Sequence, residues 1–251
     1  MKKYYLTLGC AVVLLLSACA TKTGLEKYEG QSAQQIFVGA EKSLQKGDYK
    51  DASDRYEALE ALYPYGDYAQ QTELNIIYSY YKDRDYDSAI AAADRYTHLY
   101  PQGPATDYAY YMKGLAEFSR NEGFFERYLP LNISARDNAS IQQAFNDFND
   151  FLTRYPTSVY APDARQRMVF LRNLLAEQQL QIGQYYYSRK AYVGAAERGR
   201  VVVTQYPHSD SVEAALVLMY QSYQQLQLTS DAVQVRAVLQ ANYPEALKGL
   251  K

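Results

Sequence analysis

The sequence has 251 residues, and its 26 basic and 28 acidic side chains give a formal net charge of −2 at pH 7. This mildly acidic balance, without any block of basic residues, excludes nucleic-acid binding as the basis of function. Tyrosine is the preferred large side chain, with 28 tyrosines and no tryptophan, so many aromatic contacts are expected to carry a hydroxyl group.

Residues 1–18 are predicted to be a signal peptide. Lys2 and Lys3 precede an uncharged apolar run from Leu6 to Leu16. Such a run is too short to span a bilayer as a stable helix and is typical of a secretion signal.

The sequence LSAC at residues 16–19 resembles the lipobox of bacterial lipoproteins, in which the signal is cut before a cysteine that then carries a diacylglycerol. We therefore expect a lipidated Cys19, followed by a linker to residue 30. The alternative is an ordinary signal peptide with an incidental cysteine. Residue 20 is Ala20, not the Asp that retains many lipoproteins in the inner membrane, so the resemblance implies the periplasmic face of the outer membrane. Cys10 lies inside the signal, which leaves no thiol for catalysis, a disulfide or a metal site.

Five Tyr-Pro pairs divide the rest of the chain. Their prolines, at positions 64, 101, 156, 207 and 244, are 37, 55, 51 and 37 residues apart. Proline ends a helix at the residue before it, because it lacks an N–H group and restricts its neighbour. Four pairs continue with a residue that we expect to N-cap the next helix: Gly66, Gly103, Ser158 and Ser209.

Residues twelve and eight positions before four of these prolines are mostly small. A small residue on a helix lets a second helix approach closely. The pattern resembles the tetratricopeptide repeat, a helix pair on a 34-residue module. The positions are Ala52 and Tyr56, Ala89 and Ala93, Ala144 and Phe148, and Ala195 and Gly199.

We therefore predict an all-α solenoid of about five tetratricopeptide-like helix pairs. Repeats 1–3 are expected at residues 31–156 and repeats 4–5 at residues 157–251. Gly47 matches the glycine of the turn between the two helices of a repeat, and Arg84, Lys190 and Gln227 replace it in later repeats.

Two spacings between prolines exceed the module. The surplus of the third repeat falls at residues 119–139, which we predict to form a loop with Phe124, Phe125 and Leu129 exposed. The surplus of the fourth repeat is predicted to lengthen one helix, from Pro162 to about Tyr187. Stacked repeats present extended concave surfaces and usually bind other molecules instead of catalysing reactions.

No group of residues suits catalysis or metal binding. The two histidines, His98 and His208, have no partner at the spacing of metal ligands or of a catalytic triad. Acidic pairs such as Asp147 and Asp150 are expected on solvated helix faces, without the cleft and the tuned pKa that acid–base catalysis requires. We expect no enzyme, no metal and no cofactor.

An aromatic stripe on the first helices of the second and third pairs is the candidate binding site. Spacings of three and four residues place its members on one face, and in a tetratricopeptide superhelix the first helices line the concave groove. An aromatic groove with a cation suits an extended peptide that ends in an aromatic residue and a carboxylate. The alternative is that the tyrosines hold adjacent repeats together. The predicted groove residues are Leu74, Tyr78, Tyr81, Lys82, Tyr108, Tyr111, Leu115 and Phe118.

Nearly the whole chain resembles the ComL-type lipoproteins of the outer-membrane β-barrel assembly machinery. The resemblance rests on the lipobox, the five Tyr-Pro repeats, the insertion that contains "GFFERY", and the long segment that begins "DARQRMVFLRNLLAEQQ". The insertion and the lengthened helix are its most specific parts, because generic tetratricopeptide arrays lack both.

The resemblance implies a periplasmic scaffold without enzymatic activity. Its C-terminal repeats would dock on the POTRA domains of the barrel insertase BamA, with Arg198 at the contact, and other lipoproteins of the machinery would be further partners. Its N-terminal repeats would recognise the C-terminal peptides of unfolded outer-membrane proteins.

Two other classes of protein remain open. A tetratricopeptide pilotin lipoprotein for a secretin or a type IV pilus would share the anchor and the repeats, but such modules usually keep the plain 34-residue period. A lytic transglycosylase with a helical superhelix would need an appended catalytic domain, and the repeats continue to Pro244.

Overall fold

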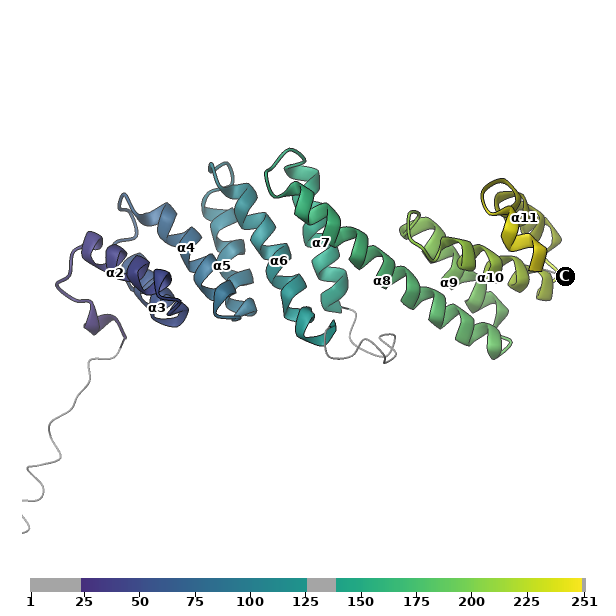
Figure 1. Ribbon diagram of the computed structural model, residues 1–251, viewed down its shortest axis with the longest axis horizontal. Helices are drawn as coiled ribbons and strands as arrows, with labels where there is room; N and C mark the ends of the chain where they lie inside the picture. Colours follow the sequence, from purple (N-terminus) through teal and green to yellow (C-terminus); the bar gives the residue numbers. More distant parts are fainter. Residues whose placement is uncertain (1–23, 126–138, 250–251) are drawn as a thin grey trace, which may run out of the picture. The chain divides into compact units, whose positions relative to one another are not determined.

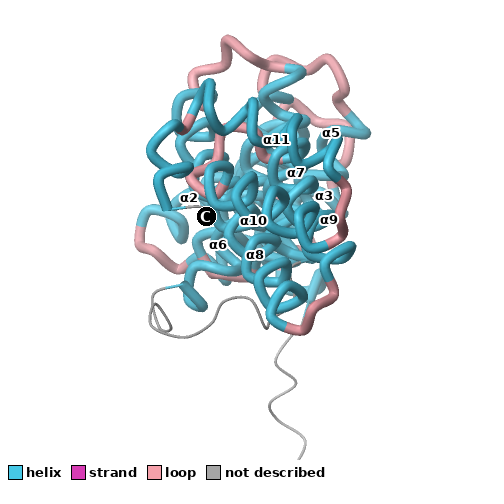
Figure 2. Tube along the Cα trace, turned by 90° about the vertical axis from the view of Figure 1, so that its right-hand side faces the viewer, coloured by secondary structure: helices cyan, strands magenta, loops and turns pink. Residues whose placement is uncertain are grey.

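The computed structural model describes residues 24–125 and 139–249, and of residues 121–125 it describes the backbone only. Within these ranges the chain is an all-α solenoid whose ten α-helices follow one another as five pairs, with no β-strand (Figures 1 and 2). The predicted fold class is therefore confirmed. The chain divides into two compact units, Met1–Ser79 and Tyr80–Lys251, which we describe separately.

The first unit contains a short 3₁₀ helix, η1 (Gly24–Lys27), then α2 (Ala33–Gln45), α3 (Tyr49–Leu62) and most of α4 (Ala69–Lys82). Ser32 and Gln35 form a capping box that fixes the start of α2. Ile36 of α2 and Leu59 of α3 form a buried apolar cluster together with Tyr28.

The second unit begins within α4 and continues through seven further helices, each packed against the next in chain order (Figure 1). α10 also contacts α8, as expected for the first helices of adjacent repeats. A second 3₁₀ helix, η3 (Pro244–Gly249), packs on the last α-helix. The helices are α5 (Tyr86–Leu99), α6 (Thr106–Phe125), α7 (Ala139–Arg154), α8 (Ala161–Ser188), α9 (Tyr192–Gln205), α10 (Val212–Gln225) and α11 (Thr229–Asn242).

The Tyr-Pro pairs end helices as predicted. Tyr63, Tyr100, Tyr206 and Tyr243 are C-caps with ψ between 52° and 62°, outside the helical range, because each precedes a proline. Each of their N–H groups still donates to the carbonyl four residues earlier, so the last turn of each helix remains intact.

The expectation that the residues two positions after these prolines N-cap the following helices is wrong. α8 and α10 begin three residues after Ser158 and Ser209, and neither helix has a side-chain cap. Instead, the backbone carbonyls of Ser158 and Ser209 accept hydrogen bonds from the N–H groups of Ala161 and Val212.

The two longer spacings differ in outcome. α8 spans Ala161–Ser188, which confirms the lengthened helix. The loop expected at residues 119–139 begins later than predicted, because α6 continues through Phe125 and Ser119 is buried. The predicted exposure of Phe124, Phe125 and Leu129 concerns side chains that lie outside the described part of the structure.

Within the described residues, four turns inside the repeats each contain one left-handed residue. Gly47 has φ 78°, and Arg84, Lys190 and Gln227 occupy the same place with φ of 64°, 62° and 60°. After each one, the next N–H group donates to the carbonyl five residues before it, which is the bond of a Schellman motif. A residue with a β-carbon is strained in this conformation. At Arg84, Lys190 and Gln227, replacement by glycine would therefore relieve backbone strain.

We predict that Gln227→Gly stabilises the array by up to about 1 kcal/mol, because glycine adopts positive φ without the steric cost of a β-carbon. Urea unfolding followed by circular dichroism measures the change. Gln225→Gly, placed in the last helical turn of α10, is the matched control and should destabilise by about 0.5–1 kcal/mol. Equal effects of the two substitutions would contradict the assignment of strain to Gln227.

Candidate peptide-binding surface and partner contact

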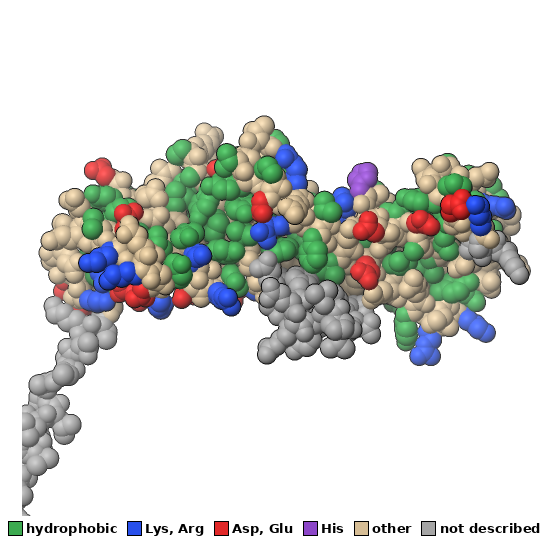
Figure 3. Space-filling view, viewed as in Figure 1, with side chains coloured by type: hydrophobic (Ala, Val, Ile, Leu, Met, Phe, Trp, Pro, Cys, Tyr) green, Lys and Arg blue, Asp and Glu red, His purple; other side chains and the backbone are tan. Residues whose placement is uncertain are grey.

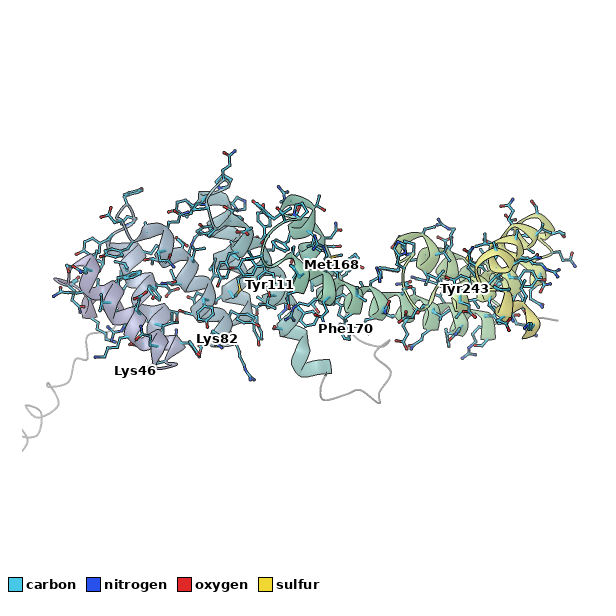
Figure 4. The ribbon with its side chains drawn as sticks, turned by 45° about the horizontal axis from the view of Figure 1, so that its top comes forward. Lys46, Lys82, Tyr111, Met168, Phe170 and Tyr243 are labelled. Carbon is cyan, nitrogen blue, oxygen red and sulfur yellow. The ribbon has the colours of Figure 1, made fainter. Side chains whose placement is uncertain are left out.

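Tyr111 lies at the junction of α6, α7 and α8 (Figure 4). Only 9% of its surface is exposed. Its ring stacks on that of Tyr160, with centroids 4.8 Å apart and planes at 12°, and it approaches Phe151 at 5.8 Å. This predicted groove residue therefore contributes to packing between adjacent helix pairs.

The hydroxyl group of Tyr111 donates a hydrogen bond of 2.8 Å to Oδ2 of Asp163 on α8. Burial, together with this neighbouring carboxylate, raises the pKa of Tyr111 far above its ordinary value. Burial would also raise the pKa of Asp163, but hydrogen bonds from Arg167 and Tyr111 outweigh it, so this pKa lies below its usual value. Tyr111 is thus a fixed donor at neutral pH.

Leu115 and Phe118 continue the buried row along α6. The Phe118 ring meets Phe148 edge-on at 6.4 Å, and the guanidinium of Arg167 lies over it, 4.8 Å from its centroid. These side chains offer little surface to a ligand.

The other predicted groove residues are more accessible. Tyr78 is 38% exposed and Lys82 is exposed, whereas Leu74, Tyr81 and Tyr108 are half-buried. Leu74 and Tyr78 belong to the first unit, and the remaining six to the second. Tyr81 is held in place because its hydroxyl lies 3.2 Å from the Ser119 hydroxyl.

Arg198 lies on α9 with its stem against α8. Its Cβ is 3.1 Å from the place where a Cβ on Gly183 would stand, and its Nη1 donates 2.7 Å to Oε1 of Gln179. The side chain of Arg198 is half-buried. Ala195, Gly199 and Val202 on the same helix are buried.

A charged cluster on α5, α6 and α7, in which Asp147 is buried, was missed by sequence analysis. Lys113 donates 2.8 Å to Asp94 and lies 3.6 Å from Asp147, which is buried and accepts a further hydrogen bond from Gln143. The expectation that Asp147 lies on a solvated face is wrong. Burial raises its pKa despite the nearby Lys113. The signal was present in the sequence, because Asp147 directly precedes Phe148 and follows Ala144 by three residues, on the buried face of α7.

Both histidines lie on the surface, since His98 and His208 are exposed. In the part of the chain that the structure describes, no group of three or more His, Cys, Asp or Glu residues is placed to hold a metal ion. No helix within the described ranges is both long enough and apolar enough to cross a membrane. Cys19 and the signal segment lie outside the described residues.

Comparison with known families decides the relationship. The sequence model of the family YfiO, described as "Outer membrane lipoprotein", matches residues 29–239. The chain belongs to this family. The match covers all five helix pairs except the end of the last one.

Curated relatives are identical to the chain at about a third of the aligned residues. The "Outer membrane protein assembly factor BamD" of Neisseria meningitidis serogroup B is 35% identical over 250 residues, which are 98% of this chain and 93% of the relative. The BamD of Vibrio cholerae is 32% identical over 240 residues, covering 96% of this chain and 99% of the relative. The chain is therefore similar to these proteins over nearly their full lengths.

Proposed function

We propose that the protein is a scaffold lipoprotein, without enzymatic activity, in the machinery that assembles β-barrel proteins in the outer membrane. The observation that carries the proposal is the identity to curated assembly factors over nearly the whole chain. A stack of five helix pairs supports it, since such arrays provide binding surfaces. The names of these relatives favour this function over a pilotin.

The proposed attachment is a lipid on Cys19 at the periplasmic face of the outer membrane. The sequence LSAC at residues 16–19 and membership of an outer-membrane lipoprotein family support it. Mass spectrometry of the mature protein should find an N-terminal Cys19 that carries a diacylglycerol, and an unmodified Cys19 would contradict the anchor.

We further propose that the predicted groove residues recognise the C-terminal peptides of unfolded outer-membrane proteins. Among them, Tyr78 and Lys82 on α4 present the most accessible surface, an aromatic ring and a cation one helical turn apart. Tyr111, Leu115 and Phe118 would act indirectly, by holding α6 against α7 and α8. The exposed residues would therefore contact the peptide directly, and the buried ones would keep the helices in place.

Tyr78→Ala is expected to weaken binding of a synthetic peptide that ends in an aromatic residue by about 2 kcal/mol, roughly thirtyfold in Kd. Because Tyr78 is exposed, helicity and melting temperature should change little. Fluorescence anisotropy measures the affinity. An amidated peptide should also bind more weakly, because its carboxylate no longer attracts Lys82.

Two control variants separate recognition from folding. Tyr65→Ala removes a tyrosine that is 98% exposed, at the turn before α4, and should leave affinity unchanged. Tyr111→Ala empties a packed site and should destabilise by about 3–5 kcal/mol. Unchanged affinity of a well-folded Tyr78→Ala variant would remove Tyr78 from the proposed surface.

The proposed contact with the POTRA domains of BamA involves Arg198, with other lipoproteins of the machinery as additional partners. The hydrogen bond from Arg198 to Gln179 and the packing of the Arg198 stem against α8 hold the guanidinium in a fixed position. A planar guanidinium held in this way can bind a carboxylate of the partner with two parallel hydrogen bonds. Arg200, in contrast, is exposed and already pairs with Glu197 on its own helix.

Arg198→Glu is expected to abolish co-purification with BamA at physiological salt, because a like-charge pair at an interface costs several kcal/mol. Arg200→Glu changes the net charge equally and should retain BamA. Melting temperatures of both variants are measured first. A stable Arg198→Glu variant that keeps BamA at low and physiological salt would place Arg198 outside the interface.

A further inference from the structure

The turn between α8 and α9 exposes large apolar side chains beside two cations. Tyr185 at the end of α8 is 56% exposed and Val193 at the start of α9 is 68% exposed. Arg189 and Lys190, which form the turn itself, are exposed as well. The guanidinium of Arg189 lies over the Tyr185 ring, 5.4 Å from its centroid. We call these four residues the α8–α9 tip.

Negative charge is absent from this part of the chain. Residues 178–196 contain no Asp or Glu. Of the two flanking carboxylates, Glu177 accepts a hydrogen bond from Gln181, and Glu197 forms an ion pair with Arg200. On the face that Figure 3 shows, the end of α8 away from α7 carries hydrophobic and basic side chains at the lower edge, without an acidic one.

The equivalent turns before α3 and α5 carry an aspartate that the α8–α9 turn lacks. Asp48 and Asp85 stand directly after the left-handed residue, and each caps the following helix by accepting a backbone N–H group. Ala191 takes this place in the α8–α9 turn, with nearly the same backbone angles but no side-chain cap. The turn thus lacks a stabilising aspartate that its geometry would accept, and it gains a local positive charge.

We propose that the α8–α9 tip contacts the surface of an anionic phospholipid membrane. Tyrosine rings favour the headgroup layer of a bilayer, and Arg and Lys close to the surface are attracted by anionic lipids. Val193 would reach the apolar boundary beneath the headgroups. The contact is weak by itself, but an anchored protein stays near the membrane, so a weak second contact is enough to orient it.

The proposal rests on the proposed function only in that the protein is held at the outer membrane. Binding to lipid can therefore be tested without any protein partner. The chain from Ala20 to Lys251 retains every described residue and omits the predicted lipid. It is mixed with vesicles of phosphatidylcholine that contain phosphatidylglycerol, or of phosphatidylcholine alone, and the vesicles are floated on a density gradient.

Ala191→Asp is the decisive variant, because it should move stability and lipid binding in opposite directions. The new aspartate caps α9, so the melting temperature should rise. The same charge at the tip should lower partitioning onto the anionic vesicles about fivefold. Partitioning of the unaltered chain should fall at high salt and be much weaker on phosphatidylcholine alone.

Leu228→Asp is the matched control. Leu228 is the equivalent N-cap residue before α11 and also lacks a side-chain cap, so the substitution adds the same charge and the same type of cap at another turn. It should leave partitioning nearly unchanged. If Ala191→Asp and Leu228→Asp lowered vesicle partitioning equally, the loss would come from net charge alone, and the proposal would be overturned.

A second pair of substitutions tests the apolar part of the contact. Tyr185→Ser with Val193→Ser alters exposed side chains only and should reduce partitioning at constant charge. If this variant and Ala191→Asp both bind anionic vesicles like the unaltered chain, the tip is not a lipid contact. Loss of BamA by the tip variants with unchanged vesicle binding would assign the tip to a protein partner and would also overturn the proposal.

Discussion

Close approach between neighbouring helices, made possible by residues with little or no side chain, is the constraint on which this structure depends. Ala52, Ala89, Ala144 and Ala195 are almost completely buried at the same place in four repeats. On α9, a Cβ added to Gly199 would stand 2.9 Å from the backbone carbonyl oxygen of Ala215 on α10. Because backbone cannot move aside as a flexible side chain can, the spacing of these helices is set by the absence of that one carbon atom.

This close approach determines which residues remain for function. In the first and third repeats, buried aromatic rings, Tyr56 and Phe148, stand at the position that Gly199 occupies on α9. Tyr111, Leu115 and Phe118 are likewise taken up by packing, whereas Tyr78 is one of the side chains that the repeats leave exposed. On α11 the same position holds the exposed Arg236.

The periodic features of the fold were predictable from sequence because each is enforced locally. Proline sets the end of a helix. Arg84, Lys190 and Gln227, which replace Gly47 in later turns, adopt the same left-handed backbone. The start of α8 was less predictable, because Ser158 acts through its backbone carbonyl instead of its side chain. The candidate site was predicted only in part, since spacing identifies the face of α6 but not which neighbouring helix covers it. Burial of Asp147 depends on Lys113, which is 34 residues away in the chain and close only in the folded structure.

The most direct test of the close-approach constraint is the stability of Gly199→Ala, measured by urea unfolding against that of Gly66→Ala. The added methyl group at residue 199 would meet Met219 Cγ at 2.6 Å and the Ala215 carbonyl oxygen at 2.9 Å, whereas at residue 66 the nearest atom is 3.8 Å away. We predict a loss of about 1–3 kcal/mol for Gly199→Ala, which is typical of overpacking, and little change for Gly66→Ala. If Gly199→Ala unfolds at the same urea concentration as the unaltered protein, the spacing of α9 and α10 does not depend on the missing side chain, and the account is contradicted.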